Sequence, residues 1–576
     1  MQLTRKQSGS RGDLGDSWQL DSDKPWFHVL PREGWLNDPN GPIFYKGRYH
    51  IFYQHISGTS EWEWRMCWGH ASSADLVHWE HEPIAIEPSA SGYDASGCWS
   101  GNTTLDEKGV PTMLYTGVRL RGEPDHLLPP QAVDLGLQMI ETQCCARCDP
   151  DDTRLVSWAK LDKPAIHFPP PGMALEGWRD PFVFQRGGAG REWRLVLGSG
   201  VKGRGGTLLV YKSQDAAQGW EYAGELTTGK SRPLLDFDLG AMWECPFFTP
   251  LNAKVEADAQ PSAAGPSDGQ APPASGAAPS SNSAEEIHML CVSPYPHHRT
   301  DRPTNPCLYW LGQYRNEAFD LEAAQGPYLL DLGDVLYAPN SFRDASGRTL
   351  MLAWLQELRK GGGFDYAGCL SLPRVLALRD GVLHQEPAPE LAQLRCGASG
   401  TAAHLEVPTD KATRVPLVNA PSVDVTFTLE RGQSQQAGVL LRPWLHIEKG
   451  GAACAAAVVV DWDRSVMEVV FPSKLDASCR TFRDQDVIKR IGGPIRLDSA
   501  RQSVRMRVLM DHSVLEAFLD SGEVLTTRVY RHDPHGERDK GLYLVALGGA
   551  AVVRDLEAHE MGSIWLRPED QPVRAE

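Results

Sequence analysis

The chain has 576 residues, 41% of them hydrophobic, with a formal net charge of −17 and a pI near 5.5. A chain of this length can bury a large core and exceeds one ordinary compact domain, so two domains are expected. The charged residues are spread without long basic runs, which argues against nucleic acid or an anionic membrane surface as the main partner and favours a small neutral molecule.

The N-terminal segment contains basic residues and serines but no apolar stretch of the length that a secretory signal needs. Residues 1–22 are therefore expected to form a flexible tail. No run elsewhere approaches the length of a membrane-spanning helix. These features predict a cytoplasmic protein without a membrane partner, and they leave its oligomeric state open.

Residues 23–382 alternate short runs of aromatic and branched aliphatic residues with Gly, Pro, Asp and Asn, as in residues 42–54, 193–202 and 350–354. No long stretch shows the helical period of an amphipathic helix. The pattern predicts mostly antiparallel β-structure with tight turns. By itself it does not distinguish a sandwich, a barrel and a propeller.

Changes of composition divide the rest of the chain. Residues 257–284 consist mainly of Ala, Pro, Ser and Gly, without aromatic or branched aliphatic residues, so they cannot contribute to a core and are expected to be a disordered insert. Residues 383–399 are expected to be a linker, because prolines and a polar stretch follow the last apolar run of the first domain. Residues 400–567 alternate again and predict a β-sandwich, followed by a tail at residues 568–576.

Three acidic residues stand in unusual surroundings: Asp38 in WLNDPNG, Asp180 in WRDP and Glu244 in WECP. Each is close to a tryptophan and within two residues of a proline. The proline makes the backbone rigid, and the tryptophan supplies a flat apolar wall for a sugar face. Cleavage of a glycosidic bond needs two carboxyl groups, one as an acid and one as a nucleophile or base. Taken singly, Asp38 also fits a turn, Asp180 an ion pair with the preceding arginine, and Glu244 a half-buried acid.

The segment FHVLPREGWLNDPNG at residues 27–41 resembles the signature of glycoside hydrolase family 32, which comprises invertases, inulinases, levanases and fructan hydrolases. Further segments resemble this family in the same order along the chain. They are FYQH (52–55), WGHASSADLVHW (68–79), GCWSGN (97–102), WRDP (178–181), MWECP (242–246), LYAPNSF (336–342), AGCLSLPRV (367–375) and HSVLEAFLDSGEVLTTRVY (512–530). The resemblance covers nearly the whole chain apart from the N-terminal tail, the insert and a few loops.

The resemblance implies an all-β protein: a five-bladed β-propeller that carries the active site in its central funnel, followed by a C-terminal β-sandwich. It implies a retaining glycoside hydrolase that cleaves terminal β-D-fructofuranosyl residues from sucrose or related β-fructosides through a covalent fructosyl-enzyme. Asp38 would be the nucleophile, Glu244 the general acid/base, and Asp180 the stabiliser that binds fructose hydroxyls. By the same mapping, the residues that line the fructosyl pocket are Trp35, Asn37, Gln54, Trp99, Ser100 and Arg179.

Arg179 is expected to keep the neighbouring Asp180 ionised, so that this carboxylate accepts hydrogen bonds from sugar hydroxyls beside a developing positive charge. The chain departs from the family pattern at the pocket rim. Asn102 stands where the family usually has a serine, and Trp62 and Trp64 do not match the spacing of the usual pocket tryptophan. These departures leave the preferred fructoside open, rather than the type of reaction.

Other functions remain open on the sequence alone. A fructan exohydrolase or a fructosyltransferase would use the same residues and the same covalent intermediate. An inverting enzyme that acts on arabinan or xylan would need a wider spacing of its carboxyl groups, and loss of one acid would favour a non-catalytic carbohydrate-binding protein. No cofactor is expected. No metal site is expected either, because the CxxC of Cys145 and Cys148 has no second pair at zinc-ligand spacing.

Overall fold

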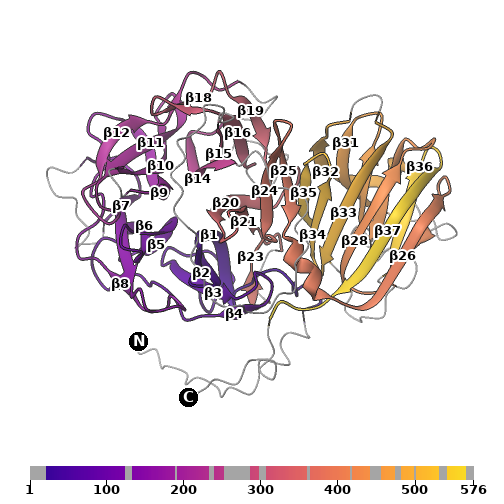
Figure 1. Ribbon diagram of the computed structural model, residues 1–576, viewed down its shortest axis with the longest axis horizontal. Coiled ribbons are helices and arrows are strands. Elements are labelled where there is room, and N and C mark those ends of the chain that lie inside the picture. The colour runs from indigo at the N-terminus through magenta and orange to yellow at the C-terminus, as the bar shows by residue number, and fades with distance from the viewer. Residues whose placement is uncertain are drawn as a thin grey trace, which may run out of the picture.

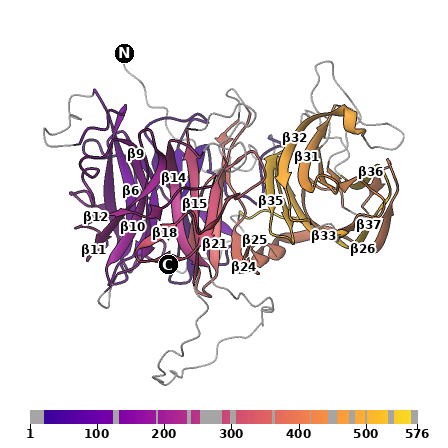
Figure 2. The ribbon, with the colours of Figure 1, turned by 90° about the horizontal axis from the view of Figure 1, so that it is seen from above.

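The computed structural model describes residues 21–122, 133–187, 191–232, 239–251, 286–296, 306–359, 364–415, 418–441, 456–473, 482–497, 501–530 and 541–565. Within these residues the chain is almost entirely β-structure, arranged as two bodies that lie side by side (Figures 1 and 2). Nearly all of the predicted N-terminal tail, the predicted insert at 257–284 and the predicted tail at 568–576 lie outside the described residues.

The first body contains, within the described residues, five sheets around a common centre, the blades of a propeller (Figure 1). Blade 1 comprises β1 (Gly34–Tyr45), β2 (Arg48–Ile56), β3 (Cys67–Ser73), β4 (Trp79–His81) and β22 (Tyr366–Ala367). Blade 2 comprises β5 (Gly97–Leu105), β6 (Pro111–Leu120), β7 (Met139–Cys148) and β8 (Trp158–Lys160). Blade 3 comprises β9 (Leu175–Gln185), β10 (Trp193–Val201), β11 (Gly205–Ser213) and β12 (Glu221–Glu225).

The remaining blades follow in chain order. Blade 4 comprises β14 (Met242–Leu251), β15 (Ile287–Tyr295), β16 (Leu308–Gly312) and β19 (Gln325–Leu329). Blade 5 comprises β20 (Leu336–Arg343), β21 (Thr349–Leu355), β23 (Cys369–Leu370), β24 (Arg374–Arg379) and β25 (Val382–Pro387). A small additional sheet is formed by β13 (Thr227–Thr228), β17 (Tyr314–Arg315) and β18 (Ala318–Asp320).

The innermost strands β1, β5, β9, β14 and β20 contact one another in a closed ring. The ring closes where β1 pairs in parallel with β22, with Gly34 opposite Tyr366 and Trp35 opposite Ala367. Apolar side chains on the blade faces fill the space between neighbouring blades. This packing fixes the inner strands relative to one another, so that residues from different blades meet at the centre.

The second body is a sandwich of two six-stranded antiparallel sheets within the described residues, and it confirms the predicted fold class. One sheet comprises β26 (Arg395–Val407), β37 (Ala551–Met561), β28 (Ser422–Glu430), β33 (Ser503–Asp511), β34 (Val514–Leu519) and β35 (Val524–Arg528). The other comprises β27 (Thr413–Arg414), β36 (Leu542–Leu547), β29 (Gln436–Leu441), β30 (Ala456–Asp461), β31 (Val466–Pro472) and β32 (Val487–Pro494). Alternate residues such as Val425, Phe427 and Leu429 point into the core between the sheets.

The segment between the two bodies is short and structured. The residues predicted as a linker, 383–399, include all of β25 except its first residue, the 3₁₀-helix η2 (Pro389–Leu394) and the start of β26. A second 3₁₀-helix, η3 (Asp484–Asp486), precedes β32 in the sandwich. The last propeller blade is therefore joined to the sandwich by only a few residues.

The two bodies share a buried apolar interface. Leu391 of η2 and Phe27, which precedes the first blade, belong to the same cluster as Leu509, Phe518 and Val524 of the sandwich. In Figure 2, β35 accordingly lies against β24 and β25 of the last blade. Burial of this continuous cluster favours one fixed arrangement of the bodies.

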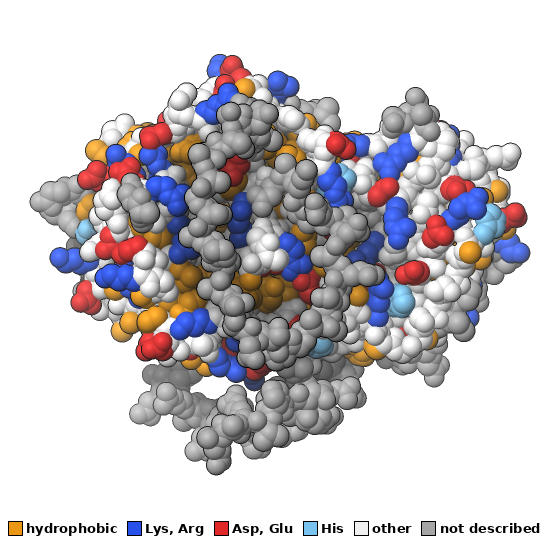
Figure 3. Space-filling view, in the orientation of Figure 1, with side chains coloured by type: hydrophobic (Ala, Val, Ile, Leu, Met, Phe, Trp, Pro, Cys, Tyr) orange, Lys and Arg blue, Asp and Glu red, His pale blue; other side chains and the backbone are white. Residues whose placement is uncertain are grey.

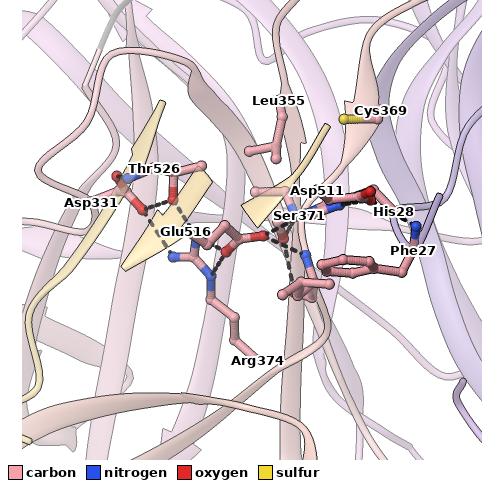
Figure 4. A network of polar contacts seen from close by, with 12 residues as sticks. Phe27, His28, Asp331, Leu355, Cys369, Ser371, Arg374, Asp511, Glu516 and Thr526 are labelled. Atoms are coloured by element: carbon pink, nitrogen blue, oxygen red, sulfur yellow. Dashed lines mark hydrogen bonds and ion pairs between the residues drawn. The ribbon is translucent and has the colours of Figure 1, made fainter. Parts of the chain in front are cut away.

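A buried polar network crosses the same interface (Figure 4). Glu516 of β34 accepts hydrogen bonds from Arg374 Nη2 at 2.6 Å and Nε at 3.1 Å, and from the Leu372 backbone N–H at 2.8 Å. His28 lies between Glu516 (3.1 Å) and Asp511 (2.8 Å). Burial alone would lower the pKa of His28, but these two carboxylates outweigh burial and raise it above 6.5. The protonated imidazole thus ties the chain before blade 1 to the sandwich.

On the face shown in Figure 3, acidic and basic side chains are interspersed over both bodies rather than gathered into one patch. A search of the described residues finds no helix long and apolar enough to span a membrane.

Candidate active site

The innermost strand of every blade carries the same irregularity. In each case the inner strand advances three residues while its hydrogen-bonded partner advances two, which is a β-bulge. The bulges lie at residues 36–39 of β1, 98–101 of β5, 179–182 of β9, 244–247 of β14 and 337–340 of β20. A bulge bends its strand and re-aims the side chains at that point, so each blade presents side chains to the centre at the same level of the ring.

Each bulge contains three consecutive residues that end in proline or glycine, here called the bulge triplet. The triplets are 37–39 (NDP), 99–101 (WSG), 179–181 (RDP), 244–246 (ECP) and 337–339 (YAP). Proline is tolerated because a bulged residue need not donate to the ladder. The middle residues Asp180, Cys245 and Ala338 have positive φ angles of 62°, 45° and 50°. Such angles are unfavourable for residues other than glycine, and here the surrounding bulge holds them.

The bulge triplets surround a pocket with a cavity volume of about 610 Å³. The first residue of all five triplets lines this pocket: Asn37, Trp99, Arg179, Glu244 and Tyr337. The remaining lining residues are Asp38, Gln54, Trp62, Trp64, Ser100, Gln138, Met139, Asp180, Tyr295, Trp354 and Gln356. All three predicted acids are therefore brought together in one pocket.

Asp38 is held in a ring of hydrogen-bond donors. It accepts from Ser100 Oγ at 2.6 Å, from Asn37 Nδ2 at 3.1 Å and from Cys245 Sγ at 3.3 Å. Burial raises the pKa of Asp38 above its ordinary 3.8, and the charge of Glu244 adds to this, while the Ser100 hydroxyl lowers it. If Asp38 must be ionised to react, activity is lost as the pH falls through this raised pKa.

Ser100→Ala is expected to move the acidic limb of kcat/KM to higher pH by about one unit and to reduce the plateau by roughly tenfold. The reason is that the Asp38 carboxylate loses the donor that favours its charged form. Ser346→Ala, an exposed change in the turn between β20 and β21, is the control and should leave the profile in place. A pH profile of turnover measures both, and an unmoved limb in Ser100→Ala would contradict the expected role of Ser100.

Asp180 receives different support. Its carboxylate accepts the Cys245 backbone N–H at 2.9 Å and lies 3.6 Å from Cys245 Sγ. Burial raises the pKa of Asp180 to about 7; Arg179 lowers it, and the charges of Glu244 and Asp38 raise it. The structure thus differs from the expectation that Arg179 would keep Asp180 ionised, because the guanidinium makes its hydrogen bonds to other carboxylates and does not outweigh burial.

Glu244 is held by groups from the neighbouring triplets. Arg179 donates to Glu244 Oε1 from Nη2 at 2.6 Å and from Nε at 3.2 Å, and the Tyr337 hydroxyl donates to Glu244 Oε2 at 2.7 Å. Arg179 also donates from Nη1 to Glu141 Oε1 at 2.7 Å. The second oxygen of Glu141 accepts the Trp178 backbone N–H at 2.7 Å. Glu141 of β7 therefore anchors the guanidinium that in turn orients Glu244.

The other predicted pocket residues form a chain of hydrogen bonds behind Asp38. Trp35 Nε1 donates to Asn37 Oδ1 at 2.8 Å, and Asn37 Nδ2 donates to Gln54 Oε1 at 3.0 Å. Gln54 Nε2 donates to Ser100 Oγ, whose own proton goes to Asp38. This chain fixes the orientation of Asn37 and Ser100, two of the donors that face the carboxylate.

Tryptophans form the walls on two sides. Trp99 stacks on Trp64 with ring centroids 5.7 Å apart, and Trp62, which is 43% exposed, packs edge-on against Trp64 at 5.1 Å. Trp35 does not line the pocket; it packs edge-on at 5.8 Å against Trp354, which does. Of the two tryptophans predicted as walls, Trp99 lines the pocket, and Trp62 and Trp64 line it as well despite their unusual spacing.

Several residues of the site were not among those proposed from the sequence. Six of them line the pocket, namely Gln138, Met139, Tyr295, Tyr337, Trp354 and Gln356, and Glu141 binds Arg179 without lining it. Tyr337 could have been found, because it lies in LYAPNSF (336–342), one of the segments that resemble the family. The others follow no such pattern, since they come from second and third strands, or from residues next to those strands, that only the closed ring brings to the centre. A search of the described residues finds no cluster of three His, Cys, Asp or Glu side chains that could hold a metal ion.

Comparison with known sequences agrees with this geometry. The family model "Glycosyl hydrolases family 32 N-terminal domain" matches residues 28–387, and "Glycosyl hydrolases family 32 C terminal" matches residues 390–560. An insoluble isoenzyme of beta-fructofuranosidase from Arabidopsis thaliana is 27% identical over 573 residues, covering 90% of this chain and 86% of that protein. The sucrose-6-phosphate hydrolase of Escherichia coli is 27% identical over 567 residues, covering 94% of each.

Solved structures show the same architecture. Fructan 1-exohydrolase IIa from Cichorium intybus superposes with a TM-score of 0.71 at 23% identity, covering 94% of this chain and 98% of that one. An exo-inulinase from Aspergillus awamori superposes with a TM-score of 0.67 at 20% identity, covering 95% of this chain and 100% of that one. With both family models matching in order and spanning the propeller and the sandwich, the chain belongs to family 32 of the glycosyl hydrolases.

Proposed function

We propose that the chain is a retaining β-fructofuranosidase that cleaves terminal β-D-fructofuranosyl residues from sucrose or related β-fructosides. The observation that carries the proposal is the placement of Asp38 and Glu244 in one pocket with different partners. Asp38 accepts from neutral donors, whereas Glu244 is bound by a guanidinium and a phenol. A retaining glycosidase requires such a pair, one carboxylate to attack the anomeric carbon and one carboxyl to exchange a proton.

The chemistry follows from these surroundings. In the first step Asp38 attacks the anomeric carbon of the fructosyl unit, the glycosidic bond breaks, and Glu244 gives its proton to the leaving oxygen. In the second step Glu244 takes a proton from water, whose oxygen replaces Asp38 on the anomeric carbon. Asp180, beside both, accepts hydrogen bonds from the fructosyl hydroxyls, and the tryptophans provide the apolar walls.

The names of the relatives support the substrate class. They are beta-fructofuranosidases and a sucrose-6-phosphate hydrolase, and one solved relative is a fructan 1-exohydrolase. The pocket of about 610 Å³ is of the size that binds small molecules. A disaccharide such as sucrose fits this volume.

The test is a substrate panel with the purified chain: sucrose, raffinose, inulin and levan, with fructose and glucose quantified separately. Hydrolysis of sucrose should release the two sugars in equal amounts, and Asp38→Ala is the inactive control. Preference for inulin or levan would identify a fructan exohydrolase. An excess of glucose over fructose at high sucrose would identify a fructosyltransferase, and no sugar released from any of the four would overturn the proposal.

A further inference from the structure

Among the described residues, the hydrogen bonds that Glu244 accepts leave one acceptor direction of its carboxylate for a proton. A carboxylate has two oxygens with about two acceptor directions each. Oε1 receives two N–H groups of Arg179, at 2.6 and 3.2 Å, and Oε2 receives the Tyr337 hydroxyl at 2.7 Å. Among the described residues no other donor reaches this carboxyl group. The remaining direction therefore belongs to Oε2.

The two oxygens also differ in how they can respond to a proton. A guanidinium has donors only and stays charged, so a proton on Oε1 would face N–H groups that cannot accept it. The Tyr337 hydroxyl is adaptable, because it lies 3.4 Å from the carbonyl oxygens of both Ser293 and Pro294. When Glu244 is protonated, the Tyr337 hydroxyl can therefore donate to one of these carbonyl oxygens instead of to Oε2.

We propose that Tyr337 is a positioning residue for the general acid/base: its hydroxyl directs the transferred proton to Oε2 of Glu244 and stabilises the carboxylate after that proton has left. The inference rests on the proposed function and assigns a role to the fifth bulge triplet. Arg179, Glu244 and Tyr337 open the triplets of three successive blades. The acid/base is thus held between its two neighbours in the ring.

The hydroxyl stabilises one protonation state more than the other. A hydrogen bond to a carboxylate is charge-assisted and about twice as strong as one to a neutral group, so Tyr337 favours ionised Glu244. Burial raises the pKa of Tyr337 well above 10, and the nearby Glu244 adds to this. The phenol therefore remains a donor through the whole range in which the enzyme would work.

The stabilisation of ionised Glu244 by Tyr337 matters in both steps of the reaction. When the glycosidic bond breaks, the Oε2–H bond of Glu244 also breaks, its electron pair stays on Oε2, and the leaving oxygen takes the proton. When water attacks the fructosyl-enzyme, an O–H bond of water breaks and its proton returns to Oε2. The ionised carboxylate between these events is the species to which Tyr337 donates.

Charged groups of both signs face Glu244. Arg179 of β9 carries a positive charge beside it, and the carboxyl groups of Asp180 on β9 and Asp38 on β1 face it as well. The Cys245 thiol is neutral, because burial and these three carboxylates raise its pKa well above 9. Tyr337 is thus a neutral group that donates to Glu244 in addition to the Arg179 guanidinium.

The first test is Tyr337→Phe, assayed on sucrose and on an aryl fructoside whose leaving group is an acidic phenol. On sucrose, the basic limb of kcat/KM should move to higher pH by about one unit, because ionised Glu244 is less stabilised. On the aryl fructoside, the acidic limb of kcat should move to higher pH by a similar amount while kcat/KM changes little, since only the second step needs ionised Glu244 as a base. Azide, which needs no base, should restore kcat.

Tyr222→Phe is the matched control, since its ring is exposed on the outer strand β12 and its hydroxyl contacts Met173 Sδ at 3.6 Å. It should leave both profiles unchanged. A uniform loss in Tyr337→Phe, with the basic limb unmoved and no response to azide, would overturn the proposal.

A stability measurement covers the case in which Tyr337→Phe folds poorly. In the Glu244→Gln background no charge needs the phenol, so the loss of Tm caused by Tyr337→Phe should be smaller there than in the wild-type background. Equal losses in both backgrounds, or a failure to fold in both, would overturn the proposal. This stability comparison needs no substrate, so it tests the role of Tyr337 even if the wild-type protein hydrolyses no fructoside. That outcome would contradict the proposed function and not the role of Tyr337.

Discussion

Asp38→Ala is expected to lower turnover of every β-fructoside by about 10⁴-fold or more, because no side chain remains to form the covalent fructosyl-enzyme. The loss should be the same for poor and good leaving groups. Binding of fructose to the variant, measured by calorimetry, should persist, since Asp180 and the tryptophan walls are untouched. Retention of wild-type turnover on any fructoside would exclude Asp38 as the nucleophile.

Glu244→Ala is expected to fail differently. On sucrose the variant should lose most of its turnover. On an aryl fructoside with an acidic phenol it should retain the first step, because such a leaving group needs little protonation. The second step should then be limiting, and added azide should accelerate it. The azide adduct should have the β-configuration of the substrate, since two displacements restore the starting stereochemistry. An adduct of inverted configuration, identified by NMR, would rule out the covalent route.

Glu516→Ala is expected to reduce the free energy of unfolding by about 3–5 kcal/mol, because it leaves the buried guanidinium of Arg374 without its main partner. Loss of this carboxylate also removes one of the two that hold His28. Turnover per folded molecule should stay near the wild-type value, since Glu516 lies in the interface and not in the pocket. Denaturant unfolding together with active-site titration measures both quantities.

Glu430→Ala provides the comparison. Glu430 also belongs to the sandwich and pairs with Arg554, but both side chains are partly exposed, 34% and 47%. Removal of such a surface pair should change stability by no more than about 1 kcal/mol. If Glu516→Ala abolished turnover while leaving stability intact, the sandwich would have a direct part in catalysis.

The three acids could be selected from the sequence because each stands in a short motif beside Trp and Pro, and the structure brings all three to one pocket. The motifs could not show which way a side chain points. Arg179 and Asp180 are adjacent in the chain, yet the bulge in β9 directs the guanidinium toward Glu244 and Glu141. Partners of this kind come from other blades and depend on ring closure.

A further pattern was present in the sequence. The segments NDP, WSG, RDP, ECP and YAP are spaced irregularly, from 62 to 93 residues apart, so they do not resemble an ordinary repeat. Their equivalence becomes visible only when each is placed on a bulge of an innermost strand. Tyr337 was missed for this reason: its triplet contains no acid, and its role depends on Glu244 in the preceding blade.

The parallel pairing of β1 with β22 constrains the synthesis of the protein. β1, which carries Asp38, gains this neighbour only after residue 366 has left the ribosome. Until then the nascent chain exposes an unpaired strand edge, a surface that favours aggregation. Joining segments so distant in the chain is also slow, because the loop between them must be closed first. The strand of the proposed nucleophile therefore gains its second neighbour only after all five innermost strands have been synthesised, and a chain released before that point lacks this pairing.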